Sequence, residues 1–183
     1  MSLFLETERI EFHHIEPNQG PLFFDLNSDP EVMKYLTDGK PHTEIEIQEI
    51  MERVAKLRIK YNDQYGNYFA FKKEDNEFIG WFCLRPGHDD PENFDLIEVG
   101  YRLKKKFWGH GFATEGARAL MNKAFNEYKT KKVFAITMLK NTGSSNVMKK
   151  IGLKFSHDFT EDKFPGDDKR AVWYELENPF LNS

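Results

Sequence analysis

A strand, a loop with two glycines and the start of a helix follow one another without a gap between Glu98 and Glu115. The segment reads Glu-Val-Gly-Tyr-Arg-Leu-Lys-Lys-Lys-Phe-Trp-Gly-His-Gly-Phe-Ala-Thr-Glu. Gly109 and Gly111 let the backbone approach a ligand closely and turn its N–H groups inward, while the new helix offers unpaired N–H donors and the positive end of its dipole. The segment therefore predicts an anion site that a pyrophosphate fits, with the main-chain amides of residues 107–113 as donors.

Two other phosphate-binding loops are excluded by the residues around the glycines. The Walker pattern needs a lysine and then Ser or Thr directly after its last glycine, but Phe112 and Ala113 follow Gly111. The Rossmann fingerprint needs three glycines, and Gly116 is not at the third position. A glycine pair alone is also typical of a plain strand-to-helix turn, so the wider motif has to identify the anion. The run Lys104–Lys106 is expected to assist an anion electrostatically.

The composition favours a single α/β domain spanning residues 1–183. A chain of 183 residues is long enough for one good core and short for two. A hydrophobic share of 39% can fill that core, and a charged share of 31% suits a soluble surface. No repeat, low-complexity tract or linker interrupts the chain.

Charge and residue usage exclude several classes of protein. A net charge of −4 and a pI near 5.9 argue against nucleic-acid binding and make a cationic substrate easier to accommodate. The first twelve residues lack the features of a secretory signal, and no apolar run is long enough to span a membrane, so we expect a cytoplasmic protein without a membrane partner. Cys83 is the only cysteine and the six histidines lack metal-binding spacing, so no metal is expected.

Hydrophobic periodicity predicts the element order β-α-α-β-β-β-α-β-α-β-β. Strands are expected at residues 9–15, 68–72, 78–84, 96–103, 132–139, 153–159 and 171–177. Helices are expected at residues 29–36, 43–61, 113–128 and 144–151. Thr43 with Glu46 forms a capping-box pattern at the start of the second helix. The charged turn at residues 73–77 and the polar loop at residues 160–170 each predict an antiparallel hairpin.

The glycine segment resembles the cofactor-binding motif of the GNAT superfamily of N-acetyltransferases. Gly100-Tyr-Arg-Leu followed by Phe107-Trp-Gly-His-Gly-Phe-Ala-Thr-Glu carries the resemblance. It is similar in particular to the branch of ribosomal-protein N-terminal (alanine/serine) acetyltransferases, whose chains open with Thr-Glu-Arg, as at Thr7, and contain Asp-Pro-Glu-Val-Met, as at Asp29. The likeness spans nearly the whole chain and implies a mixed, mostly antiparallel central sheet flanked by helices.

A second motif agrees with this family. Its spacing Asn-x-x-Ser-x-x-aliphatic-x-x-Lys-x-Gly-aromatic is matched, with leucine in place of the aromatic, by Asn141, Ser144, Val147, Lys150, Gly152 and Leu153. The family's tyrosine on this late helix is Met148 in this chain, and methionine cannot donate a proton.

The resemblance implies acetyl-CoA as co-substrate and a set of residues that bind it. The backbone of Tyr101–Leu103 would pair with the pantetheine arm, and Asn141 and Ser144 would contact that arm. Lys106 stands where the family often has Arg or Gln, which keeps a charge but loses the planar fork. Trp108 is expected to pack the loop against the sheet and His110 to face solvent. The full set of cofactor-binding candidates is Tyr101, Arg102, Leu103, Lys106, Trp108, Gly109, His110, Gly111, Phe112, Ala113, Thr114, Asn141 and Ser144.

Acetyl transfer to an amine by direct attack in a ternary complex needs a neutral amine, a polarised thioester carbonyl and a proton for the departing thiolate. Glu98 is the candidate base, because strand alternation puts it on the face of Gly100 and the family often places a glutamate two residues before that glycine. A charged strand residue is also often salt-bridged. The Val99 amide is the candidate oxyanion donor by family analogy. The general acid is unassigned, and Cys83 is interpreted as a packing residue.

The sequence does not identify the amine that accepts the acetyl group. The resemblance favours a protein N-terminus or a small amine such as an amino acid, a polyamine or an aminoglycoside. Acidic residues in loops 89–95 and 161–168 either attract a cation or form ordinary exposed loops. Two other interpretations are a non-catalytic regulatory module that binds acetyl-CoA, and a nucleotide-binding protein that ATP or NAD would stabilise more than CoA. A homodimer is plausible by family habit.

Overall fold

The computed structural model describes residues 2–37, 40–87 and 89–181. Its strands form an eight-stranded sheet in the order β1-β2-β3-β4-β5-β6-β8-β7. The strands are β1 (Leu3–Glu6), β2 (Ile10–His14), β3 (Gly66–Lys72), β4 (Glu77–Pro86), β5 (Leu96–Leu103), β6 (Lys132–Met138), β7 (Lys154–Thr160) and β8 (Arg170–Glu177). The helices are α1 (Gly20–Asn27), α2 (Pro30–Met33), α3 (Glu44–Lys60), α4 (Phe112–Asn126) and α5 (Thr142–Lys150), with short 3-10 turns η1 (Pro17–Gln19) and η2 (Lys105–Phe107). This mixed, mostly antiparallel sheet with flanking helices confirms the predicted fold class.

The chain divides into two compact units. The first comprises residues 1–83 and 101–112, and the second comprises residues 84–100 and 113–183. Strands β4 and β5 each contribute residues to both units.

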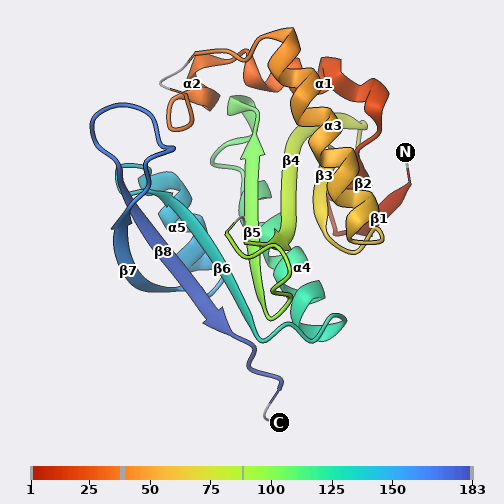
Figure 1. The fold of residues 1–183 in the computed structure, drawn as a ribbon. Helices are drawn as coiled ribbons and strands as arrows, with labels where there is room; N and C mark the ends of the chain where they lie inside the picture. The colour runs from red at the N-terminus through yellow and green to blue at the C-terminus, as the bar shows by residue number, and fades with distance from the viewer. Residues whose placement is uncertain (1, 38–39, 88, 182–183) are drawn as a thin grey trace. The chain divides into compact units, whose positions relative to one another are not determined.

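The first unit is built around a core between its helices and β3. Helices α1 and α3 pack against each other, and α3 packs against β3 (Figure 1). On α3, Ile47, Met51 and Val54 are buried at the spacing that places them on one face of a helix. They join Phe23 of α1 and Phe69 of β3 in one hydrophobic cluster. The amphipathic pattern therefore fixes which face of α3 turns inward.

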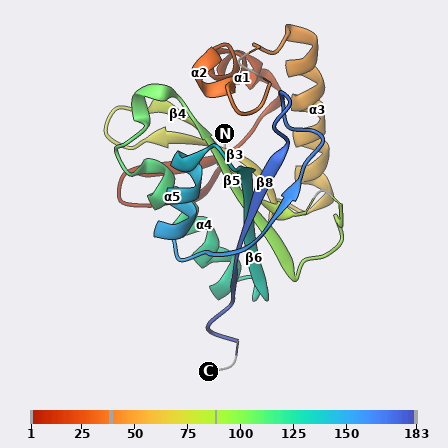
Figure 2. The ribbon, with the colours of Figure 1, turned by 90° about the vertical axis from the view of Figure 1, so that its left-hand side faces the viewer.

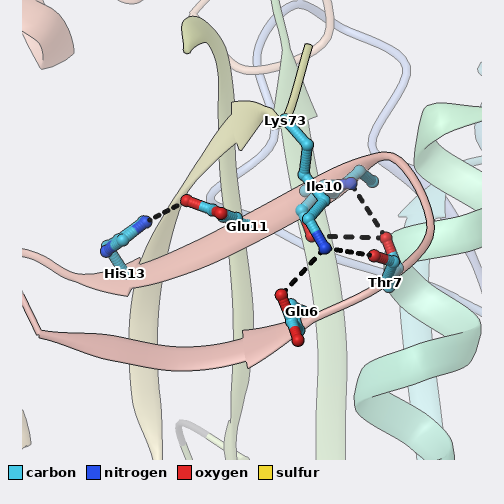
Figure 3. A network of polar contacts seen from close by, with 6 residues as sticks. All are labelled: Glu6, Thr7, Ile10, Glu11, His13 and Lys73. Atoms are coloured by element: carbon cyan, nitrogen blue, oxygen red, sulfur yellow. Dashed lines mark hydrogen bonds and ion pairs between the residues drawn. The ribbon is translucent and has the colours of Figure 1, made fainter.

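A hairpin of β1 and β2 opens the chain, and β1 was not predicted from the sequence. The Thr7 amide donates to the Ile10 carbonyl at 2.8 Å, which closes the turn between the strands. Figure 3 shows Lys73 from the following hairpin reaching this turn, where its Nζ lies 2.8 Å from a Glu6 carboxylate oxygen and 3.2 Å from the Thr7 carbonyl. Because β1 has four residues and lies at the sheet edge, it depends on pairing with β2 rather than on a periodic pattern of its own.

Helix α1 is the second element that the sequence prediction missed. Two prolines in Pro17-Asn-Gln-Gly-Pro21 suggest a turn, but proline is tolerated in the first turn of a helix because its missing N–H is not needed there. Glu16 and Gln19 also form a capping box around η1. The helix is held by burial of Phe23 and Leu26 in the core, which is a tertiary effect.

The second unit centres on β6, which lies between two strands of opposite sense. It pairs in parallel with β5 at Leu96–Glu98 and antiparallel with β8 along its whole length. Strand β7 pairs with β8 as the predicted closing hairpin and has mostly exposed side chains. Figure 2 shows α4 and α5 on the same side of β6 and β8, and Arg118 Nη2 donates to the Lys150 carbonyl at 2.6 Å to join the two helices.

The helix ends differ slightly from the predicted ones. Helix α4 begins at Phe112 and α5 at Thr142, one and two residues before the predicted starts at 113 and 144. In α5 the reason is Asn141, whose side chain caps the helix from outside it. Cys83 is buried in β4, in agreement with its interpretation as a packing residue. None of the helices in the described ranges combines the length and apolarity needed to cross a bilayer.

The capping box of α3 gives a test of this fold. Thr43 Oγ1 accepts from the Glu46 amide at 3.3 Å, and Glu46 Oε2 accepts from the Thr43 amide at 2.7 Å. We expect Thr43→Ala to lower the free energy of unfolding by about 1 kcal/mol, because an N-terminal amide of α3 loses its acceptor. Urea unfolding measures this loss. Gln48→Ala, on the exposed face of the same helix, is the control, and an equal loss in both variants would contradict the capping role.

Candidate active site

The glycine loop starts from a tight turn at the end of β5. In η2 the Phe107 amide donates to the Lys104 carbonyl and the Trp108 amide to the Lys105 carbonyl, both at 3.0 Å. The backbone then takes left-handed φ values of 78° at Gly109 and 86° at Gly111. Residues with a Cβ rarely adopt such values, so both positions require glycine. Helix α4 begins at the next residue, Phe112.

This geometry narrows the set of amides that can bind an anion. The expectation that donors run from residue 107 to residue 113 is wrong at its start, because the amides of Phe107 and Trp108 are used inside η2. The amides of residues 109–112 have no backbone acceptor among the described residues. Alternating left-handed glycines turn consecutive N–H groups toward one side, which is the arrangement of an anion-binding nest. The loop from Gly109 into the first turn of α4 is therefore the candidate anion site.

Side chains within the loop hold it to the end of β5. Trp108 Nε1 donates to the Leu103 carbonyl at 2.8 Å, and the Phe107 and Phe112 rings meet edge to face with centroids 5.6 Å apart. The indole of Trp108 is still 43% exposed, so it ties the loop down by a hydrogen bond more than by burial. His110 is exposed, with Nδ1 at 2.7 Å from the Trp108 carbonyl.

Arg9 clamps the same loop, and sequence reasoning gave it no role. Its Nη1 donates to the His110 carbonyl at 3.1 Å, and its guanidinium carbon lies 4.4 Å from the centroid of the Phe112 ring. A Cβ on Gly111 would lie 3.4 Å from Arg9 Nη2. The only sequence signal was the opening Thr-Glu-Arg, because a contact across a hundred residues leaves no local pattern.

The three lysines before the glycines are each paired with an acid. Lys104 pairs with Asp25, Lys106 pairs with Glu77, and Lys105 Nζ lies 3.7 Å from a Glu31 carboxylate oxygen. These pairs offset much of the positive charge of the run. The anion site therefore depends mainly on backbone N–H groups and the helix terminus. A contact between Lys106 and phosphate remains a prediction, which would require Lys106 to leave Glu77.

Glu98 lies where β5 separates from β6. The parallel pairing ends at Glu98 and Phe134, and Val99 and Gly100 have no ladder partner on β6 in the second unit. Arg85 Nε donates to Glu98 Oε2 at 3.0 Å, and the Glu98 side chain is 17% exposed. Glu98 is thus a partly buried carboxylate oriented by an arginine. The β5 backbone that follows it is not paired with β6.

The late helix supplies a cap and an apolar side chain. Asn141 Oδ1 accepts from the Ser144 amide at 3.2 Å at the start of α5. This cap gives Asn141 and Ser144 a local structural role, and their contact with a cofactor remains a prediction. Met148, at the position of the family's tyrosine, is buried.

The predicted site residues, which are the cofactor-binding set and the catalytic candidate Glu98, fall into two groups. The first group lies in the first unit and begins with Tyr101. The centroid of the Tyr101 ring is 6.0 Å from that of the Phe82 ring. That group is Tyr101, Arg102, Leu103, Lys106, Trp108, Gly109, His110, Gly111 and Phe112. The second unit carries Glu98, Ala113, Thr114, Asn141 and Ser144. Arg102 differs from the other members, because its side chain points to α1 and α2. The described residues contain no cluster of three or more His, Cys, Asp or Glu side chains that would hold a metal.

Comparisons with known proteins point to one family. A family model described as an acetyltransferase (GNAT) domain matches residues 9–154. An FsC-acetyl coenzyme A-N(2)-transacetylase of Aspergillus fumigatus is 33% identical over 180 residues, which cover 94% of this chain and 75% of the relative. The fold resembles a GNAT-family acetyltransferase of Bacillus anthracis, with a TM-score of 0.81, 21% identity and coverage of 96% of this chain and 99% of the other. It also resembles a ribosomal L7/L12 alpha-N-protein acetyltransferase in complex with coenzyme A, with a TM-score of 0.78, 15% identity and coverage of 96% and 98%.

The left-handed glycine gives a direct test of the anion site. We expect Gly111→Ala to raise the dissociation constant of CoA about tenfold, because a Cβ in the left-handed region costs about 1–2 kcal/mol. Calorimetric titration with CoA measures the change. Gly20→Ala is the matched control, since Gly20 has a helical φ of −46° and its added Cβ would meet Ile47 at an ordinary 3.8 Å. Unchanged affinity in the Gly111 variant would rule out the loop as the binding site.

Arg9 gives a second, independent test. Arg9→Met should weaken CoA binding by about threefold to tenfold, because a hydrogen bond and a cation–π contact that order the loop are each worth roughly 1 kcal/mol. Lys73→Met is the control, because Lys73 is a cation near the same β1–β2 turn that pairs with Glu6 instead (Figure 3). If both variants bind CoA equally, Arg9 does not position the loop.

Proposed function

Because the chain belongs to the GNAT family of acetyl-CoA-dependent acyltransferases, we propose that it moves the acetyl group of acetyl-CoA to a primary amine by direct attack in a ternary complex. The observation that carries this proposal is the loop of Gly109 and Gly111, whose left-handed backbone directs amides of residues 109–112 toward an anion. The diphosphate of acetyl-CoA is an anion of that size.

The proposed reaction joins the amine nitrogen to the thioester carbonyl carbon and breaks the carbon–sulfur bond. The nitrogen must be unprotonated to attack, and it loses a second proton as the amide forms. The products are an N-acetylated amine and CoA with a free thiol. The chain therefore has to accept protons from the amine and stabilise charge on the carbonyl oxygen.

Glu98 is the proposed proton acceptor. It is a partly buried carboxylate in β5 whose position is fixed by Arg85 Nε at 3.0 Å. An ion pair of this kind restricts the rotamers of the carboxylate, while the second oxygen can still accept a proton directly or through one water. The contact with Arg85 therefore supports an oriented carboxylate as the base.

The backbone of β5 just after Glu98 is the proposed donor to the carbonyl oxygen. The Val99 amide follows the last residue pair of the parallel β5–β6 ladder. A preorganised N–H at such an opening stabilises developing negative charge without a cost of reorganisation. The general acid remains unassigned, because Met148 is apolar and buried, and a thiolate can leave and take its proton from water.

The acceptor is proposed to be an amine because the named relatives act on nitrogen. The Aspergillus relative is named for an N(2) position of FsC, and the coenzyme A-bound neighbour is named for the alpha-amine of ribosomal L7/L12. These names describe those proteins and support only the amine class for this chain. The choice between a protein N-terminus and a small amine needs an assay.

The organisation of the working protein is also a proposal. The family model spans residues 9–154 and so includes parts of both compact units, which supports one functional domain over residues 1–183. We expect this domain to act in the cytoplasm, on an amine and acetyl-CoA without nucleic acid or membrane, as a monomer or a homodimer.

One assay tests cofactor, reaction and acceptor class together. The purified chain is incubated with acetyl-CoA and a panel of peptides, amino acids, polyamines and aminoglycosides, and released thiol is followed with time. The proposal expects amine-dependent thiol release and an acetylated product of matching mass. Binding of acetyl-CoA without thiol release for any amine would indicate a regulatory module instead.

The role of Glu98 as the proton acceptor is tested by replacing it with glutamine. We expect Glu98→Gln to lower kcat by at least about tenfold, because a positioned general base typically contributes about 10²–10⁴-fold, with little change in the dissociation constant of acetyl-CoA. Glu175→Gln is the matched control, because Glu175 is also a half-buried sheet carboxylate in an ion pair, with Lys132 at 3.1 Å. A Glu98 variant with the rate of the unsubstituted protein would remove Glu98 from the mechanism.

A further inference from the structure

A cluster of polar side chains surrounds Arg102 in the first unit and takes no part in the acetyl transfer described above. Arg102 projects from β5 toward α1 and α2, where Nη1 donates to Asn27 Oδ1 and lies 3.6 Å from the sulfur of Met33. Its guanidinium carbon is 5.1 Å from the centroid of the Trp81 ring in β4. Trp81 stacks in turn on Phe23. The guanidinium is thus held between a helix end and an aromatic face.

Several polar atoms of this cluster are buried without a hydrogen-bond partner. They are Arg102 Nε, Asn27 Nδ2, Trp81 Nε1 and His42 Nδ1. Arg102 Nη2 also makes no hydrogen bond with a described residue. Four of these five atoms are N–H donors in every state, and a buried donor without an acceptor costs roughly 1–3 kcal/mol. Such a set is uncommon in a protein interior unless something else satisfies it.

The charge of Arg102 has no acidic partner within the part of the chain that the structure describes. Burial lowers the pKa of Arg102 to about 10, so the guanidinium stays charged at neutral pH. His42 lies close enough that burial first and then the Arg102 charge lower its pKa, together with Arg53 and against Glu46. A largely buried guanidinium that faces N–H donors, with no acid among the described residues, lacks its counter-ion.

The cluster can be reached from solvent. Asn27 is fully buried at its base, whereas Arg102, Trp81 and His42 each keep part of their surface exposed. The neighbouring lysines differ from Arg102, because Lys104 and Lys105 are paired with Asp25 and Glu31. Arg102 thus differs from these two lysines in having no acid partner among the described residues.

The shape of the donor set selects the kind of anion. Since Nη1 of Arg102 is used by Asn27, the free edge of the guanidinium is the one formed by Nε and Nη2. This edge presents two parallel N–H bonds, which match the two oxygens of a carboxylate. The amide of Asn27 and the indole N–H of Trp81 add donors for the remaining lone pairs.

We propose that the cluster of Arg102, Asn27, Trp81 and His42 binds a carboxylate of the acceptor, so that the acceptor is an amine that also carries a carboxylate. This inference rests on the proposed acetyl transfer to an amine and names its substrate class. It assigns Arg102 a role in specificity, separate from the loop that binds the diphosphate. Arg102 lies on β5, the strand that also provides Glu98.

Paired acceptors test the proposal. An amino acid and its carboxamide have the same amine and differ in the carboxylate. The unsubstituted protein should use the free acid with a kcat/KM about tenfold to a hundredfold above that of the amide, mainly through KM, as expected for a charge-assisted bidentate contact. Arg102→Met should bring the ratio close to one.

Arg53→Met is the matched control. Arg53 is an exposed cation of α3 that also acts on His42, so its loss removes the same charge from the neighbourhood without removing the buried fork. It should keep the preference for the acid. Trp81→Phe keeps an aromatic ring and removes the indole N–H together with its five-membered ring. It should raise KM for the acid about threefold or more and leave KM for the amide unchanged, even if the Arg102 variant does not fold.

A binding measurement separates this proposal from the proposed function. The N-acetyl amino acid and its carboxamide are titrated by calorimetry into the protein saturated with CoA, which requires no turnover. The carboxylate site is supported if the acid binds more tightly than the carboxamide and if this difference disappears in the Trp81 and Arg102 variants. This result would support the site even if no amine is acetylated. The proposal is overturned if amines are acetylated but the acid and the carboxamide are used equally well and bind equally tightly. The donors around Arg102 would then hold only water.

Discussion

The left-handed backbone at Gly109 and Gly111 is the constraint on which the candidate site depends. It turns the amides of residues 109–112 away from the loop's own carbonyls, and a helix begins before the chain can bend back. Two contacts keep this conformation in place, the Trp108 indole on the Leu103 carbonyl and Arg9 on the His110 carbonyl. The loop is therefore prepared for an anion before the anion arrives, which reduces the entropy lost on binding.

The cations of the first unit divide into paired and unpaired ones, and this division separates two tasks. Lys104, Lys105 and Lys106 are paired with acids, so the proposed diphosphate site would rely mainly on main-chain donors. Arg102 is buried without an acid among the described residues, surrounded by further unsatisfied donors. A side-chain fork selects an anion by shape, which suits the role proposed for Arg102 in distinguishing acceptors. A backbone nest suits the role proposed for the glycine loop, which is to bind the constant diphosphate of acetyl-CoA.

Local patterns predicted most of the secondary structure, and long-range pairing explains what they missed. Helix α3 has a capping box and an apolar stripe, so it was predicted nearly to the residue. Strand β1 and helix α1 were missed because one is a four-residue edge strand and the other starts among prolines, and both are held by contacts with distant residues. The donors of the loop were overestimated by two residues, because the turn η2 uses the amides of Phe107 and Trp108.

The sequence by itself determined the family and the mixed sheet and indicated the candidate anion loop, since glycine spacing and hydrophobic periodicity are properties of neighbouring residues. Only the tertiary structure decided which charges meet. Arg85 at Glu98, Arg9 at the loop and Arg102 beside Asn27 each join segments that lie 13 to 101 residues apart. The reason is physical, because the partner of a charge and its exposure to water are set by packing, and packing leaves no period along the chain.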